Sequence, residues 1–290
     1  MKNSKLKFLY TFLFVALSLG AFAQEAEVIT ESTEPDDEKY LDGIVQKTLT
    51  VESRVLPWEP IREADVVWEK RIWRVIDTRE KMNLAFRYPE KPFVMLLKDL
   101  AENGDLVVFR DEKFSEKLDA EALQNIFSRP DTITRLDYET YEQTIEIVTV
   151  DINPEDINRF RVKEIWFFDE EVSRLRVRIL GIAPIKETYD EITGEFKYEE
   201  PLFWVYYPAV REAFNKNRVF NDANDAAPTT WYDLFESRNF SSYIYKMSNV
   251  NDMRVKDYFE TSANPGIDML LESQRIKDEL FNFEHDLWAY

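Results

Sequence analysis

"RVKEIWFFDEEVSRLRVRILGI", Arg161 to Ile182, contains two strand-like runs joined by a short acidic segment at residues 169–171. The acidic segment is typical of a turn, and a hairpin turned there would bring Arg176 close to Glu164. Residues of the second run alternate in character, so that one face of a strand would carry Leu175, Val177 and Ile179 and the other Arg174, Arg176 and Arg178. The stretch therefore predicts an antiparallel hairpin at the centre of the fold.

Further strand signals lie on both sides of this hairpin. "YEQTIEIVTVDI" (Tyr141 to Ile152) alternates apolar and polar residues, and the aromatic run "PLFWVYY" (Pro201 to Tyr207) follows a hairpin loop at Gly194. Helical signals surround these runs, and they comprise a helix over 118–127 and the start, cap or stop residues Pro92, Gly104, Pro208, Thr230, Asn264 and Pro265. The pattern predicts an α+β fold, a central antiparallel β meander flanked by helices.

The segment that precedes these elements has a different character. "VLPWEPIRE" (Val55 to Glu63) places two prolines around Trp58, which keeps the backbone extended and removes two ladder donors. The next residues contain no glycine or proline and have acids in the first turn, so we expect a helix from about Glu63 to Arg79. Its apolar residues would spread more widely around the helix than a one-sided surface helix needs.

The N-terminal residues have the pattern of an exported protein. Residues 1–23 combine three lysines, an apolar run and the small residues Ala21 and Ala23, which predicts a secretory signal peptide. Residues 24–50 begin with eight acids and one lysine between Gln24 and Asp42, which predicts an acidic, disordered leader. The expected α+β domain covers residues 51–290, with an extended N-terminal arm over 51–62.

Charge and composition exclude several classes of protein. The 37 cations and 56 acids give a formal charge of −19, and loss of the signal peptide with its three lysines makes it −22. No nucleic acid is expected as a partner of so acidic a chain. The chain has no cysteine, so its stability must come from an apolar core, and it lacks the lipobox cysteine that would carry a lipid anchor. No later apolar run is long enough for a transmembrane segment in the mature chain, which we expect in the periplasm or outside the cell.

Motifs that carry chemistry are sparse. The single histidine, His285, has no cysteine or G-x-S-x-G serine to act with, and zinc sites built from histidine and cysteine are excluded. We therefore expect no catalytic residue, no metal and no cofactor, and the chain is predicted not to be an enzyme. Two alternatives stay open. One is a secreted carboxylate-dependent glycoside hydrolase with two carboxyl groups in an aromatic-lined pocket. The other is a carbohydrate-binding protein that exposes Trp204 and Tyr206.

Positive charge and aromatic rings gather in one place on this acidic chain. "WEKRIWRVIDTREKMN" (Trp68 to Asn83) contains two tryptophans and five cations, and the proline-locked arm comes before it. Rigid aromatic arms bind at low entropic cost, and tryptophan and arginine dominate binding energies at interfaces. We predict a partner-binding surface made of Pro57, Trp58, Trp68, Lys70, Arg71, Trp73 and Arg74. The alternative is that the expected helix belongs to the core.

Two longer blocks resemble one known family. "LPWEPIREADVVWEKRIWRVIDTREKMN" (Leu56 to Asn83) and "SSYIYKMSNVNDMRVKDYF" (Ser241 to Phe259) are similar to the gliding-motility protein N family, GldN or PorN, of the type IX secretion system. The resemblance implies a non-enzymatic periplasmic protein on the inner face of the outer membrane. It would form a ring of neighbouring copies with the lipoprotein GldK or PorK, which would supply the anchor. A contact with the periplasmic motor subunit GldM or PorM is also implied.

Overall fold

The computed structural model describes residues 54–287, except for 137–142, 191–192 and 225–226. The expected signal peptide and acidic leader lie outside the described residues. The arm is described from Arg54, and it runs to Arg62 as an extended segment without helix or strand. None of the described helices is both long enough and apolar enough to cross a membrane.

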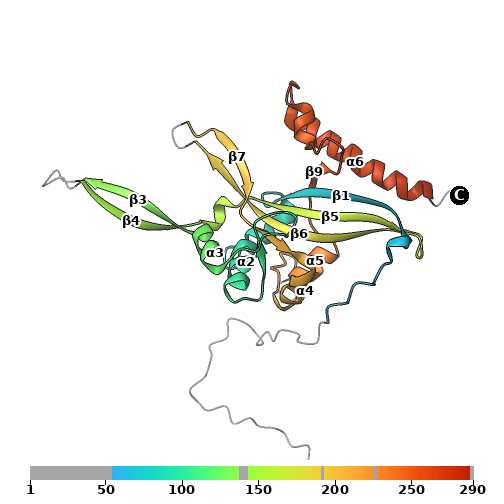
Figure 1. Cartoon of the computed structure of the whole chain (residues 1–290), viewed down its shortest axis with the longest axis horizontal. Coiled ribbons are helices and arrows are strands. Elements are labelled where there is room, and N and C mark those ends of the chain that lie inside the picture. Colours follow the sequence, from blue (N-terminus) through green and yellow to red (C-terminus); the bar gives the residue numbers. More distant parts are fainter. Residues whose placement is uncertain (1–53, 137–142, 191–192, 225–226, 288–290) are drawn as a thin grey trace, which may run out of the picture. The chain divides into compact units, whose positions relative to one another are not determined.

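An antiparallel sheet of seven strands forms the centre of the fold (Figure 1). The strand order is β2-β8-β6-β5-β1-β9, and β7 pairs with β6 outside this path. The strands are β1 (Val66–Asp77), β2 (Val108–Phe109), β5 (Arg159–Asp169), β6 (Arg174–Tyr189), β7 (Phe196–Pro201), β8 (Trp204–Tyr206) and β9 (Tyr243–Met247). The successive antiparallel pairs β5-β6 and β6-β7 confirm the predicted α+β fold with a central meander.

The predicted helix over residues 63–79 is wrong. Only Glu63–Asp65 are helical, as the short 3-10 turn η1, and the following residues form β1. β1 lies between β5 and β9, and all its residues from Ile72 to Ile76 are buried. A strand that is covered on both faces loses the alternation that marks a half-buried strand. That double burial is why its apolar residues spread so widely when they are placed on a helix.

The β5–β6 hairpin forms as the sequence predicts, with its turn at residues 170–173. The predicted neighbourhood of Arg176 and Glu164 is wrong. Arg176 lies opposite Phe167, and Glu164 lies opposite Ile179. The turn occupies residues 170–173 rather than the acidic segment 169–171, so Asp169 pairs with Arg174 and Glu164 pairs three residues farther along β6 than predicted.

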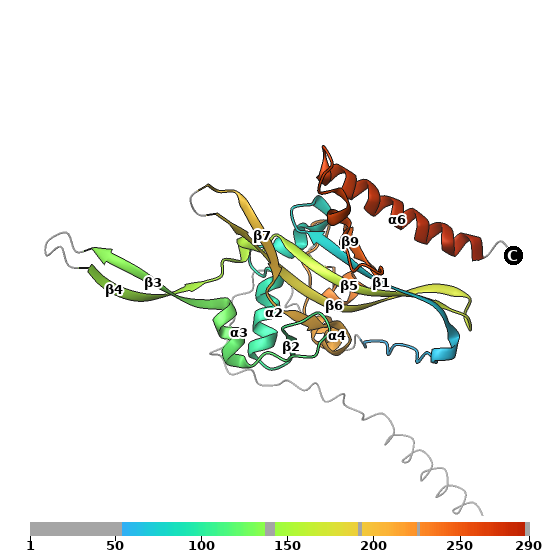
Figure 2. The ribbon, with the colours of Figure 1, turned by 45° about the horizontal axis from the view of Figure 1, so that its top comes forward.

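Four helices line the largest apolar cluster and confirm the helical signals of the sequence. They are α2 (Phe93–Glu102), α3 (Ala120–Phe127), α4 (Tyr207–Lys216) and α5 (Trp231–Glu236). The predicted capping box is present at α5, where the Thr230 hydroxyl accepts from the Asp233 amide and the Asp233 carboxylate accepts from the Thr230 amide. Figure 2 shows α2 and α4 together beneath the strands of the sheet.

α6 (Pro265–Leu287) packs beside β9 and the 3-10 helix η4 (Val255–Phe259), and Figures 1 and 2 show it running next to β1. Ile276 and Leu280, which the sequence places at helical spacing, are buried against Ile72 and Ile244. The Ser273 hydroxyl on the same face accepts a hydrogen bond of 2.7 Å from the amide of Ile244. α6 is therefore fixed to the β1–β9 end of the sheet.

The remaining elements lie outside the main sheet. β3 (Ser128–Leu136) and β4 (Gln143–Asp151) pair with each other in a separate two-stranded sheet. The strand predicted over 141–152 is thus present, but it does not join the central meander. Two further 3-10 helices, η2 (Lys81–Arg87) and η3 (Pro154–Asp156), complete the described elements.

Candidate interaction surfaces

Trp73, a predicted partner-binding residue, is a core side chain with 6% of its surface exposed. Its ring lies between two cations, with the Nζ atoms of Lys163 and Lys246 at 5.7 Å and 4.8 Å from the ring centroid. It shares an apolar cluster with Trp204 and Tyr245. Trp73 therefore stabilises one face of the sheet, and little of its surface is left for a partner to cover.

Arg74 is buried on the opposite face of β1, with 9% of its surface exposed. Burial lowers the pKa of its guanidinium, and the negative charge of Glu164 opposes that shift. Glu164 is fully buried, and its carboxylate accepts hydrogen bonds from Arg238 at 2.7 Å and from the Trp166 indole at 2.9 Å. The positive charge of Arg74 thus offsets the buried negative charge of Glu164 inside the fold.

Trp68 is half-buried, and it fastens α6 to the sheet. Its ring centroid lies 4.9 Å from that of Phe283 in the last part of α6, with the ring planes tilted by 32°. Such aromatic pairs contribute about 0.5–1.5 kcal/mol beyond the area they bury. This contact assigns Trp68 a structural role that the sequence did not reveal.

The N-terminal half of β1 alternates between half-buried and exposed side chains. Arg71 is exposed, Lys70 is half-buried, and Val67 between the arm and these cations is 66% exposed. Arg71 pairs with Glu69 at 3.7 Å, and both side chains remain exposed. Ion pairs of this kind contribute little to stability, so Arg71 is available to another protein at small cost.

The arm carries the other two predicted residues and lies elsewhere. Trp58 is half-buried, with the guanidinium carbons of Arg178 in β6 and Arg211 in α4 at 5.1 Å and 4.6 Å from its ring centroid. Pro57 is exposed. The Leu56 carbonyl accepts a hydrogen bond of 2.8 Å from Arg211. Because β5 separates β6 from β1, the seven predicted residues do not form one patch.

The outer face of α6 is an apolar surface that the sequence analysis missed. Four large side chains on it are exposed: Ile267 by 60%, Leu270 by 51%, Leu271 by 63% and Phe281 by 68%. At 100° per residue they lie opposite the buried Ile276 and Leu280. The same projection applied to 265–287 would have shown a helix with two apolar faces, which is the signal for this surface.

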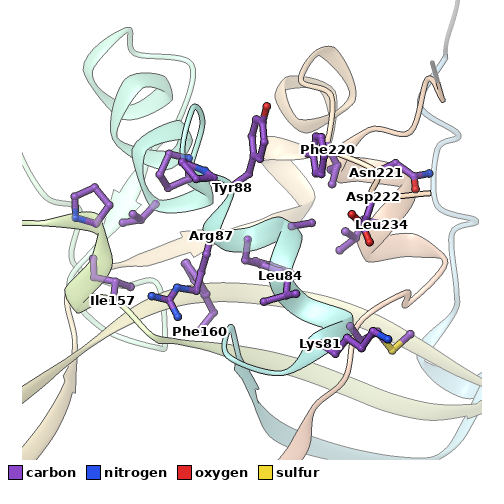
Figure 3. Close-up of a pocket in the computed structure, with 18 of the residues that line it drawn as sticks. Lys81, Leu84, Arg87, Tyr88, Ile157, Phe160, Phe220, Asn221, Asp222 and Leu234 are labelled. Carbon is purple, nitrogen blue, oxygen red and sulfur yellow. The ribbon is translucent and has the colours of Figure 1, made fainter. Parts of the chain in front are cut away.

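A cavity of about 1010 Å³ opens beside η2 (Figure 3). Its wall is mainly apolar and includes Tyr88 stacked on Phe220, with ring centroids 4.3 Å apart. Glu155 and Asp222 are the carboxylates of the lining, and both are exposed. A glycoside hydrolase needs one carboxyl group in apolar surroundings. The cavity therefore gives no support to the hydrolase alternative.

The described residues also give no support to a carbohydrate-binding site. Trp204 is 2% exposed and Tyr206 is 37% exposed, so these rings do not form the open platform expected of a carbohydrate-binding protein. Within residues 54–136, 143–190, 193–224 and 227–287, no group of three or more histidine, aspartate or glutamate side chains is placed to hold a metal ion. His285 is exposed in the last turn of α6.

Comparison with known proteins identifies one family for this chain. No curated protein matches the chain. Residues 61–289 match the model of one family, described as gliding motility associated protein GldN. That match takes in the sheet and its helices from η1 to the end of α6. The protein therefore belongs to the GldN family, and it is a component of the gliding-motility and type IX secretion machinery.

Proposed function

We propose that this protein is a non-enzymatic structural subunit of a periplasmic ring in the type IX secretion machinery. Neighbouring copies and a GldK- or PorK-like lipoprotein would build the ring on the inner face of the outer membrane. A GldM- or PorM-like motor subunit would contact the ring from its periplasmic side. Family membership supports the general role. The exposed apolar face of α6 is the observation that supports assembly with another protein.

This face has the properties of an interface. Ile267, Leu270 and Leu271 expose more than half of their surfaces within five residues of one helix. Contiguous apolar surface of this kind on a soluble protein marks a binding site for protein or membrane. The helix beneath it is held rigidly by Ser273, Ile276 and Leu280, so it can bind without prior ordering.

Charge favours a different protein over a second copy as the occupant of this face. Asp278 and Asp286 are exposed along the same helix, whereas Glu279 pairs with Arg275 at 3.1 Å. Two such helices packed face to face would bring like charges together, and the whole chain carries a formal charge of −19. The fitting partner has an apolar groove with a cationic rim. We assign this role to the lipoprotein, which would also supply the membrane anchor.

A pair of matched variants tests the proposal. Leu270→Gln combined with Leu271→Gln removes the centre of the apolar face without touching the buried one. Two leucines that are buried on binding contribute several kcal/mol, so co-purification of the lipoprotein should fall by about tenfold or more. Gln274→Ala, on the same outer face, serves as the control and should leave co-purification unchanged.

Circular dichroism of each variant distinguishes loss of binding from loss of folding. The proposed assembly fails if the double variant folds normally and retains the lipoprotein at the level of the unmodified chain. It also fails if neither the chain nor the control co-purifies with an outer-membrane lipoprotein.

A further inference from the structure

The arm occupies a site that the rest of the chain builds independently. Arg211 is 7% exposed, and its guanidinium is fixed by the Glu236 carboxylate at 3.1 Å and the Tyr232 hydroxyl at 3.3 Å. Arg176 is held by Asp169, which is itself 4% exposed, at 3.4 Å. Acids of the domain hold these two arginines, which favours their staying in place when the arm leaves.

The arm contacts this site through the Trp58 ring and through oxygen atoms that accept hydrogen bonds. Trp58 lies between Arg178 and Arg211, and the Tyr207 ring centroid is 6.4 Å from its own. The carbonyl and carboxylate of Glu59 accept hydrogen bonds from Arg178 at 2.5 Å and Arg176 at 2.8 Å. The arginine stripe of the sequence therefore binds an acceptor-rich peptide, in addition to pairing with acids across the hairpin.

Withdrawal of the arm would break no strand pairing, although it would remove the Trp58 ring from the edge of the largest apolar cluster. Residues 54–62 belong to no strand, and their contacts with the domain are made by side chains of β6 and α4. Pro57 and Pro60 keep the arm extended in either location. The short turn η1 joins it to β1 and is the segment that would have to change conformation in an exchange. The arm also leaves Leu56 70% exposed on its own domain, so its apolar surface is only partly used there.

The site is a local concentration of positive charge on an acidic chain. Burial lowers the pKa of Arg178, and the positive charges of Arg176 and Arg211 lower it further. Hydrogen-bond acceptors on a peptide reduce the repulsion between these positive charges, whether the peptide belongs to the same chain or to another copy. A copy with formal charge −19 can therefore attract part of another equally acidic copy at this one place.

We propose that the arm exchanges between copies, so that residues 55–60 of one subunit seat on Arg176, Arg178 and Arg211 of the next. The exchange rests on the proposed ring function, for which it names the contact between neighbouring copies. An exchanged arm makes the same contacts as a retained one, so only η1 changes conformation. Passing each arm to the next copy is a head-to-tail operation, which generates closed rings or open filaments.

Photo-cross-linking in cells tests the exchange on the full chain. Benzoylphenylalanine introduced at the exposed Pro57 reports what lies beside the arm. We expect cross-linked dimers and higher multiples, with the attachment mapped to residues 176–211 of a second copy. Co-expression of isotopically labelled and unlabelled chains identifies links between copies. Cross-links found only within single chains overturn the exchange.

Two substitutions of equal charge make the result specific. Arg178→Glu removes a charge-assisted hydrogen bond and a contact with the Trp58 ring, so cross-linked dimer should fall by about tenfold or more. Arg174→Glu changes an exposed arginine at the start of the same strand and should leave the dimer unchanged. An equal loss in both variants would overturn the assigned site.

The lipoprotein distinguishes this failure from failure of the proposed function. If Arg178→Glu or the unmodified chain retains the lipoprotein while all cross-links stay within one chain, the ring function stands and the exchange alone is wrong. If the unmodified chain retains no lipoprotein and forms no dimers, both proposals are wrong.

Discussion

The ring of Trp68 in β1 lies 4.9 Å from the ring of Phe283 in α6, centroid to centroid. This contact joins the first strand of the sheet to the last helix of the described chain. Trp68, which the sequence predicts to bind a partner, therefore holds α6 against the sheet. The outer face of α6 keeps its position in part because of this aromatic pair.

A double-mutant cycle measures that anchor. Trp68→Ala and Phe283→Ala should each lower the free energy of unfolding by about 2 kcal/mol, because both rings are only half-buried. The coupling between them should be about 0.5–1.5 kcal/mol. Urea unfolding followed by circular dichroism gives both values. Phe281→Ala, at a side chain that is 68% exposed, is the control and should change stability little. Strict additivity of the two losses would show that the rings act separately.

Charge reversal separates Arg71 from Arg74. Arg71→Glu alters an exposed side chain and should change the free energy of unfolding by less than about 0.5 kcal/mol. Arg74→Glu places a second carboxylate near the fully buried Glu164, so a loss of about 3 kcal/mol or more is expected. Thermal unfolding of the two variants checks the difference. Equal stability would contradict the internal role of Arg74, whereas only Arg71→Glu can report on partner binding without unfolding the chain.

Residue 181 must be glycine because the rings of Phe114 and Trp204 lie too close to its Cα atom to leave room for a Cβ atom. A Cβ atom there would lie 2.6 Å from Cζ of Phe114 and 3.2 Å from Cε3 of Trp204. Gly181→Ala should cost about 1–3 kcal/mol through overpacking. The added cost should shrink in a Phe114→Ala background, where the closest atom is gone. Gly266→Ala meets nothing within 4 Å and is the matched control. The same loss in both backgrounds would assign the cost to the backbone.

Tyrosines that the fold shields from water should limit stability at alkaline pH. Burial raises the pKa of Tyr243 to about 12, and burial also raises the pKa values of Tyr207 and Tyr245. An unfolded tyrosine ionises near pH 10. The neutral form is favoured by the fold, so this stability is present below about pH 10 and is lost as the pH rises towards 12.

Absorbance at 295 nm and circular dichroism should therefore change together over that range. Tyr243→Phe removes one ionising group and should move the alkaline unfolding to higher pH. An unchanged midpoint would show that Tyr243 ionises without any effect on the fold.

The sequence predicted those elements whose signals are local. The hairpin of β5 and β6 follows from alternation around an acidic turn, and α5 follows from the spacing of Thr230 and Asp233. β1 could not be found in this way, because Trp73 packs into one apolar cluster and Ile76 into another. Its strand identity depends on neighbours that are distant in the chain.

The positions of the candidate interface residues were harder to predict, for related reasons. The exposure of Pro57 and Arg71 agrees with their expected accessibility, whereas the burial of Trp73 and Arg74 depends on the strand that replaced the helix. Glu164 and Arg176 are not partners because the turn lies at residues 170–173, beyond the start of the acidic segment on which the prediction was centred. The outer face of α6 was visible in the sequence as a second apolar face.

The strand order also has a consequence for biosynthesis. β1 is the first strand to leave the ribosome, but its two neighbours are β5 and β9, and β9 ends at Met247. β5 can pair with one edge of β1 once it emerges, but the other edge of this aromatic strand stays open until β9 is available. A chaperone that shields residues 66–77 early in translation should increase the yield of native protein. Chains that terminate before residue 243 should aggregate.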